Sequence, residues 1–213
     1  MSTPARAERE RLCDLFLAVG PDAPTLCGGW TTQDLAAHLV VRERRPDGAI
    51  GILAKPLAGY GEKVRQHEAE RDYERIVNRV RTGPPLLSPM RPAPIERLVN
   101  TIEYFVHHED VRRASGNWGG RDLDADLKKD MQQLLPRAAR MLGRSSPVGL
   151  VLVPDDAEPV VAKKPGDDGH SVTVSGPIGE LVLFMYGRQA HALVDLAGPD
   201  DAVEAVRSAS FGI

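Results

Sequence analysis

The sequence lacks several features that define broad protein classes. No stretch approaches the roughly 18 consecutive apolar residues of a membrane-spanning helix. The formal net charge of -3 provides no basic excess of the kind that binds nucleic acid or an acidic membrane surface. No internal repeat or low-complexity tract is evident. We therefore expect no nucleic acid and no membrane among the partners of this protein.

Cysteine is also scarce, because the chain has only Cys13 and Cys27. Two cysteines at this distance cannot form a Cys-x-x-Cys metal or redox motif. The residues from Met1 to Leu12 include no apolar segment typical of a signal peptide. A disulfide between the two cysteines is not favoured in a chain without an export signal, and we expect a cytoplasmic protein.

The composition is that of an ordinary globular protein. Of 213 residues, 42% are hydrophobic and 27% are charged, which is enough for a sizeable core. The residue pattern changes near position 145. We expect a helical domain over residues 1–145 and a small α+β domain over residues 146–213, in a monomer or a homodimer.

Helical patterns separated by Gly- and Pro-rich turns fill the first of these domains. The predicted helices run from Pro4 to about Leu17, from Thr32 to about Arg45, from Gly61 to about Arg81, from about Ile95 to Ala114 and from Asp124 to about Leu142. The second helix begins with Thr31 as N-cap and Asp34 at the N3 position. The third is dense in charges, and we expect one long, mostly exposed helix.

After Ser146 the sequence becomes rich in β-branched residues. Three short strands are predicted over residues 148–153, 159–163 and 171–175, and we interpret them as a meander. A helix over residues 179–188, a strand over residues 192–196 and a helix over residues 200–209 complete the prediction.

One predicted helix carries an unusual polar stripe. Within Asn100–Ala114, Glu103 and His107 are one turn apart and Asp110 lies almost under them. At roughly 100° per residue, the three stay within about 60° of one another. The stripe lies beside the apolar face, and burying an acid and an imidazole without partners costs several kcal/mol. A shared metal ion would offset that cost.

His38, on the helix that follows Thr31, is the third candidate ligand. Two imidazoles and one carboxylate, from His38, Glu103 and His107, leave coordination positions open, as catalytic metal sites do. Zinc suits this set, and ferrous iron fits it as well. Spacing alone leaves a second interpretation open, in which a surface Glu–His pair and an unrelated core histidine bind no metal.

The other polar residues near these motifs receive simpler interpretations. His108, Glu109 and Arg112 point to the opposite side of their helix, and we expect them to face solvent. His108 remains an alternative ligand in place of His107. Cys27 precedes the Trp30 motif, where it either approaches the metal or serves as a small buried residue.

Three segments resemble a known protein family. Trp30-Thr-Thr-Gln-Asp-Leu-Ala-Ala-His-Leu39 resembles the W-(S/T)-x-x-D-L-x-x-H-L signature of the DinB-like superfamily. Glu103-Tyr-Phe-Val-His107, with Asp110, resembles the E-x-x-x-H-x-x-D motif of the mycothiol-dependent maleylpyruvate isomerase group. The segment from Gly179 to Arg188 resembles part of that group's small C-terminal domain. The forms L-C-x-G-W and V-H-H-E-D-V-R-R-A resemble an actinobacterial subgroup described as metal-binding.

The resemblance implies a DinB-like up-down four-helix bundle followed by a small α+β C-terminal domain. It implies a divalent metal, usually zinc, at positions matching His38, Glu103 and His107. It also implies mycothiol as a low-molecular-weight thiol cosubstrate and a small electrophilic substrate. A bound metal lowers the pKa of a thiol. In the isomerase reaction, thiolate addition, bond rotation and thiol elimination convert a cis alkene into a trans alkene.

The resemblance also bears on three residues outside the ligand set. Asp110 either orients an imidazole ligand or has a structural role. Arg188 matches a family arginine that reaches toward the active site and binds a substrate carboxylate, although an arginine at a helix C-terminus also interacts with the helix dipole. Asp34 either orients an imidazole or caps its helix, and capping is favoured.

Two functions follow from these observations. The first is a metal- and thiol-dependent isomerase or S-transferase, and the second is a non-catalytic metal- or small-molecule-binding module on the same fold. A regulatory zinc protein of the anti-sigma type would need a His-x-x-x-Cys-x-x-Cys motif, which the sequence lacks. Thiol-dependent turnover of an electrophile distinguishes the first two functions.

Overall fold

The computed structural model describes residues 3–45, 58–85, 88, 91–167 and 169–212. The chain divides into two compact units, Met1–Trp118 and Gly119–Ile213. The first unit is helical, and the second combines helices with a four-stranded sheet, so the predicted fold class is confirmed. None of the helices in these residues has both the length and the apolar character needed to cross a membrane.

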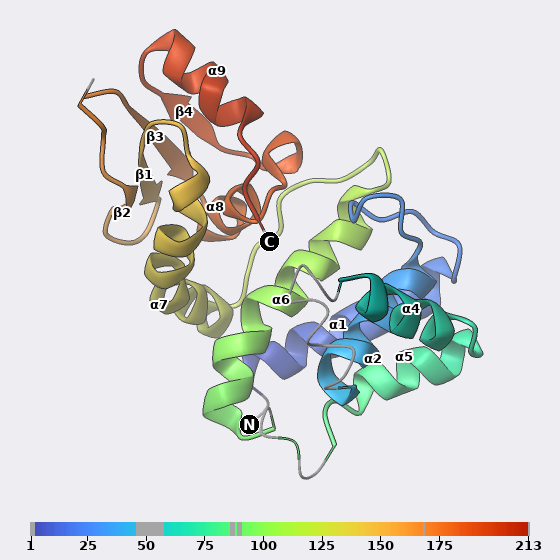
Figure 1. Ribbon diagram of the computed structural model, residues 1–213. Coiled ribbons are helices and arrows are strands. Elements are labelled where there is room, and N and C mark those ends of the chain that lie inside the picture. Colours follow the sequence, from blue (N-terminus) through green and yellow to red (C-terminus); the bar gives the residue numbers. More distant parts are fainter. Residues whose placement is uncertain (1–2, 46–57, 86–87, 89–90, 168, 213) are drawn as a thin grey trace. The chain divides into compact units, whose positions relative to one another are not determined.

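The first unit is a helix bundle (Figure 1). The helices described in it are α1 (Pro4–Val19), α2 (Thr32–Arg44), α4 (Ala58–Ala69), α5 (Tyr73–Arg81) and α6 (Ala93–Arg113). Helix α1 packs against α5 and α6, while α2 packs against α4 and α5. Helices α1, α2, α5 and α6 share one apolar core, which includes Leu12, Phe16, Leu39, Ile76 and Tyr104. Burial of this core holds the bundle together.

Helix α2 begins with the capping signal predicted from the sequence. The Thr31 amide donates to Asp34 Oδ2 at 3.1 Å, and the Asp34 amide donates to Thr31 Oγ1 at 3.4 Å. The guanidinium of Arg65 donates to Asp34 Oδ1 at 2.6 Å. Both carboxylate oxygens of Asp34 are thus used at the helix start, which agrees with capping as its role.

The predicted long helix from Gly61 to Arg81 is wrong in its continuity and its exposure. Helices α4 and α5 are separate, and the Asp72 side chain caps α5 by accepting from the Arg75 amide at 3.0 Å. The α5 side chains of Ile76, Val77 and Val80 are buried in the bundle core. The many charged residues of this segment led to the prediction of one exposed helix, in which neither the Asp72 cap nor the apolar face of α5 was recognised.

Helix α6 is buried on two sides, which the sequence analysis did not predict. The prediction that His108 and Glu109 face solvent is wrong, since they are 6% and 0% exposed. His108 Nδ1 lies 3.0 Å from Glu8 Oε2, and Glu109 accepts hydrogen bonds from Arg112 and Arg113. Because α1 packs along α6, these charged groups meet another helix and are satisfied by partners instead of water.

The described residues of the second unit form three α-helices and one four-stranded sheet, together with two short 3-10 helices. Its main elements are α7 (Ala125–Leu142), β1 (Gly149–Pro154), β2 (Val160–Lys163), β3 (Ser171–Gly176), α8 (Ile178–Met185), β4 (Asp195–Ala197) and α9 (Asp200–Ser208). Helix α7 packs against β2 and α8. This helix therefore belongs to the second unit, whereas the predicted domain boundary near residue 145 assigns it to the first domain.

The first three strands do not form the predicted meander. Strand β1 lies between β2 and β3, antiparallel to β2 and parallel to β3, and β4 completes the order β2-β1-β3-β4. The β2–β3 connection passes close to Gly149, where a Cβ atom would lie 2.8 Å from the Pro165 backbone and 3.0 Å from the His170 carbonyl oxygen. Glycine leaves the space for this crossing. The strand pattern predicted the strands but not their order.

The burial of α5 predicts a contrast between two adjacent positions. Ile76→Ala removes a fully buried side chain, so we expect a loss of about 2–5 kcal/mol in the free energy of unfolding. Arg75→Ala, at an exposed position, should change that free energy by less than about 0.5 kcal/mol. Urea denaturation measures both variants, and equal effects would contradict the packing of α5.

Candidate metal centre

The three predicted ligand side chains lie together in the first unit. Helix α2 supplies His38, and α6 supplies Glu103 and His107 one turn apart. Glu103 Oε1 lies 3.6 Å from His38 Nε2 and 3.3 Å from His107 Nε2. One ligand atom from each residue lies within 4.8 Å of the other two. Residues 65 positions apart therefore face one point because the bundle places α2 beside α6.

These distances fit a tetrahedral metal site. Zinc binds imidazole nitrogen and carboxylate oxygen at about 2.0–2.2 Å, so adjacent ligand atoms in a tetrahedron lie about 3.4 Å apart. The two measured separations, 3.3 and 3.6 Å, bracket that value. The side chains of His38, Glu103 and His107 are 13%, 23% and 12% exposed. The set thus borders solvent, as a site that exchanges an external ligand must.

Asp110 supports one of the imidazoles from behind. Its fully buried carboxylate lies 2.9 Å from His107 Nδ1. This contact places the Nδ1 proton between His107 and Asp110 and leaves Nε2 directed at Glu103. An aspartate that fixes a histidine in this way is a common partner of metal-binding imidazoles. The geometry favours the orienting role among the two interpretations of Asp110.

Cys27 lies against the same pair of residues. Its Sγ donates to Asp110 Oδ2 at 3.0 Å and lies 3.7 Å from His107 Nδ1. The loop before α2 is held there because the Leu26 amide donates to the Asp110 carbonyl oxygen at 3.1 Å. Cys13 is buried in the bundle core, and the two cysteines form no disulfide. Cys27 therefore contacts Asp110, the residue that orients His107, and is not simply a small core residue.

Arg42 was not selected from the sequence, although it stands one turn after His38. Its Nε lies 3.1 Å from Glu103 Oε1, the oxygen that also faces both imidazoles. Its two Nη atoms donate to Asn100 Oδ1 at 2.6 Å and to the Val99 carbonyl oxygen at 2.7 Å. The i, i+4 spacing from His38 was the signal that could have identified it.

Aromatic contacts fix the other imidazole. The centres of the Trp30 and His38 rings lie 5.2 Å apart, with the rings tilted by 46°. The Arg65 guanidinium lies over the Trp30 ring, 4.8 Å from its centre. Arg65 also pairs with Asp34 and Glu62. The tryptophan of the sequence motif thus positions His38 through ring packing.

The three ligand groups titrate away from their usual ranges. Burial lowers the pKa of His38, so this ring is neutral near pH 7. Burial alone would raise the pKa of Glu103, but the Arg42 charge and the contacts with both imidazoles hold that pKa well below its usual range. Burial would likewise lower the pKa of His107, but its contacts with Asp110, Cys27 and Glu103 raise that pKa well above 6.5.

The remaining candidates are His108 and Arg188. His108, the alternative ligand, pairs with Glu8 on the opposite side of α6. Arg188 belongs to the second unit, where its guanidinium donates to the Tyr186 carbonyl oxygen. The structure therefore groups His38, Glu103, His107 and Asp110 and leaves His108 out of that group.

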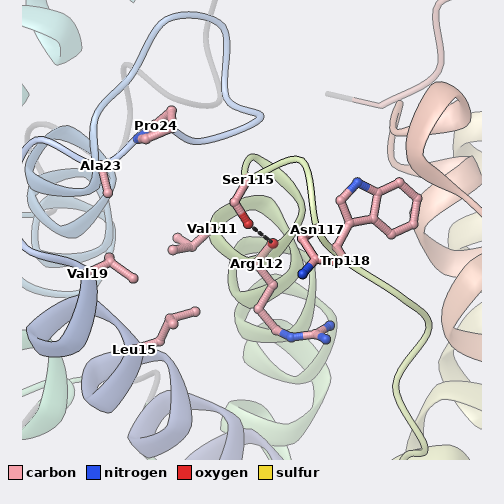
Figure 2. A pocket seen from close by; sticks show the side chains of 9 residues that line it. All are labelled: Leu15, Val19, Ala23, Pro24, Val111, Arg112, Ser115, Asn117 and Trp118. Carbon is pink, nitrogen blue, oxygen red and sulfur yellow. Dashed lines mark hydrogen bonds between the residues drawn. The ribbon is translucent and has the colours of Figure 1, made fainter.

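A separate pocket of about 240 Å³ lies further along α6. Figure 2 shows Val111 of α6 pointing toward Leu15 and Val19 of α1, with Trp118 on the other side. The lining consists of Leu15, Val19, Ala23, Pro24, Val111, Arg112, Ser115, Asn117 and Trp118. Ser115 Oγ donates to the Arg112 carbonyl oxygen at 3.2 Å. None of the four clustered residues lines this pocket, so it is a different feature from the ligand set.

Comparison with known proteins supports the same architecture. The family described as the mycothiol maleylpyruvate isomerase N-terminal domain matches residues 5–100. This stretch includes His38 and Arg42 but ends before Glu103. Among curated proteins, no significant match was found.

Two solved structures are similar over almost the whole chain. A crystal structure of the mycothiol-dependent maleylpyruvate isomerase has 18% sequence identity and a TM-score of 0.59, covering 92% of this chain and 96% of that chain. A histidine-to-alanine mutant of that enzyme gives the same identity and coverage, with a TM-score of 0.58. At this level of identity the likeness establishes the fold.

Metal binding is expected to release a proton from His107. Its raised pKa leaves the ring protonated at neutral pH, and a metal binds only the neutral ring. The lowered pKa of His38 means that this ring has no proton to release. Zn²⁺ affinity should therefore rise by up to about tenfold per pH unit below the raised pKa. Calorimetry in buffers of different ionisation enthalpy counts the protons, and no release at pH 7 would contradict the expectation.

The support from Asp110 predicts an effect on affinity. Asp110→Asn keeps the shape but weakens the acceptor for the His107 Nδ1 proton, so Zn²⁺ affinity should fall by about 10- to 100-fold. Glu109→Gln is the matched control, because Glu109 is equally buried but pairs with Arg113. Competition with a chromogenic chelator measures both. Equal losses of Zn²⁺ affinity in the two variants would show that removal of any buried negative charge has this effect, and would contradict a specific role of Asp110.

Proposed function

We propose that this chain is a metal-dependent enzyme that uses a low-molecular-weight thiol, in line with the match of residues 5–100 to the family described as the mycothiol maleylpyruvate isomerase N-terminal domain. Mycothiol is the proposed thiol, by likeness to that family. The proposed reaction is isomerisation of, or S-transfer to, a small electrophilic molecule. Fold kinship alone does not fix a reaction, so the proposal depends on the site.

One observation carries the proposal. His38, Glu103 and His107 present ligand atoms to a common point, at separations suited to a four-coordinate divalent metal. Three protein ligands leave a coordination position for an external group, which is the arrangement of a catalytic metal site. Zinc is the proposed metal, and ferrous iron also suits two imidazoles and one carboxylate.

Each side chain would have a distinct task. A divalent metal, when bound, supplies a Lewis acid that lowers the pKa of a thiol toward neutrality. Asp110 holds the Nδ1 proton of His107 and keeps Nε2 available as a ligand. Trp30 fixes the plane of His38. Arg188 is proposed to bind a substrate carboxylate, a role supported by the sequence likeness and by the suitability of guanidinium for carboxylates.

The first test is the metal content of the wild-type protein and of His38→Ala and His107→Ala. Elemental analysis should find a single metal ion per chain in the wild type and loss of stoichiometric metal in both variants. Far-UV circular dichroism should show most of the helix content retained. His67→Ala is the control, because that side chain is 71% exposed, and it should keep its metal. Full metal occupancy in both ligand variants would refute the assignment.

The second test separates an enzyme from a binding module. Mycothiol is titrated into the metal-loaded protein, and maleylpyruvate is then offered as the first electrophile, with turnover followed by NMR. Thiol-dependent conversion that is lost in His107→Ala supports the enzyme. Metal binding without response to thiol or electrophile would favour the alternative function, a non-catalytic metal- or small-molecule-binding module.

A further inference from the structure

Arg42 brings a positive charge to the oxygen that would bind the metal. Its Nε lies 3.1 Å from Glu103 Oε1, which is also the oxygen nearest to His38 and His107. The Arg42 side chain is 16% exposed, so water screens this charge only partly. A cation bound by Glu103 would therefore share its carboxylate with a guanidinium that is already in place.

The position of Arg42 does not depend on Glu103 alone. Its two Nη atoms are held by Asn100 Oδ1 and by the Val99 carbonyl oxygen. Asn100 is fully buried and donates in turn to Glu43 Oε1 at 3.0 Å. These anchors lie on α6, the helix that carries two of the ligands. The guanidinium therefore remains beside the ligand set whether or not a metal takes the carboxylate.

The local charges define the kind of external ligand that the loaded site favours. A divalent metal and Arg42 bring three positive charges, while Glu103 and Asp110 bring two negative charges, and one positive charge remains. A single external anion neutralises it. Without Arg42, the same anion would leave the group with a net negative charge.

We infer that Arg42 makes the metal centre selective for an anionic external ligand over a neutral one, while weakening the binding of the metal itself. This inference rests on the proposed metal site, and the anion in the proposed reaction is a thiolate. The two effects have opposite signs because one charge attracts the anion and repels the metal. Loss of a purely structural residue would weaken both.

The test compares two substitutions that both remove the guanidinium fork. Arg42→Lys keeps the charge and Arg42→Gln removes it, while each leaves Asn100 and Val99 without their bidentate partner. Arg75→Gln, at an exposed position on α5, makes the same change in net charge away from the ligand contacts. Chelator competition measures Co²⁺ affinity, and visible spectra of the Co²⁺ proteins measure binding of azide, an anion, and imidazole, a neutral ligand, at one fixed pH.

Relative to Arg42→Lys, Arg42→Gln should bind Co²⁺ roughly tenfold more tightly, and its ratio of azide to imidazole affinity should be roughly tenfold lower. Arg75→Gln should match the wild type in both measurements. An unchanged ratio, or weaker binding of Co²⁺ by Arg42→Gln than by Arg42→Lys, would overturn the inference. Thermal unfolding of the two Arg42 variants shows whether they are equally folded under the conditions used.

A small neutral thiol, 2-mercaptoethanol, separates this inference from the proposed function. If wild-type Co²⁺ protein binds azide in an Arg42-dependent way but gives no sulfur-to-cobalt absorption with the thiol, the inference holds and the thiol-dependent function fails. If the wild type binds thiol but the ratio of azide to imidazole affinity is the same in Arg42→Lys and Arg42→Gln, the inference alone fails. Failure of the wild type to bind Co²⁺ overturns both.

Discussion

The contact of three basic side chains with one carboxylate oxygen organises the candidate site of the first unit. Glu103 Oε1 faces His38 and Arg42 from α2 and His107 from its own helix. A carboxylate partly shielded from water needs such compensation, because an unpaired buried charge is strongly unfavourable. The same contact links α2 to α6 by polar groups. Contacts with Glu103 Oε1 therefore hold the candidate ligand side chains together, and the Arg42 guanidinium supplies positive charge beside that oxygen.

Helix α6 serves two purposes because both of its sides are covered. One side carries Glu103 and His107, whose ligand atoms converge on the candidate metal centre, and Asp110, which contacts the other ring nitrogen of His107. The other side carries His108 and Glu109, which are satisfied by charged partners on α1 and on α6 itself. Both groups are polar and at least partly shielded from solvent, yet only the first leaves ligand atoms directed at a common point. Burial of charged groups therefore does not by itself distinguish the candidate site from the structural ion pairs of His108 and Glu109.

Local signals in the sequence predicted local structure well. The Thr31 cap, the apolar periodicities and the Gly and Pro breaks led to helices and strands close to those observed, because these depend on neighbouring residues. The order of the strands and the break between α4 and α5 were not predicted correctly. The strand order requires the β2–β3 connection to pass β1 close to Gly149. The burial of Ile76 depends on a partner helix. Neither feature is therefore encoded within a few neighbouring residues.

The sequence by itself determined which side chains share a helix face, and so it paired Glu103 with His107 and placed Asp110 beneath them. It also identified His38 through the motif that begins at Trp30. Only the tertiary structure decided that α2 meets α6 so that these groups face one oxygen, and that Arg42 and Cys27 join them. The physical reason is range: helical spacing fixes neighbours three and four residues apart, whereas contacts across the bundle arise from the packing of whole helices.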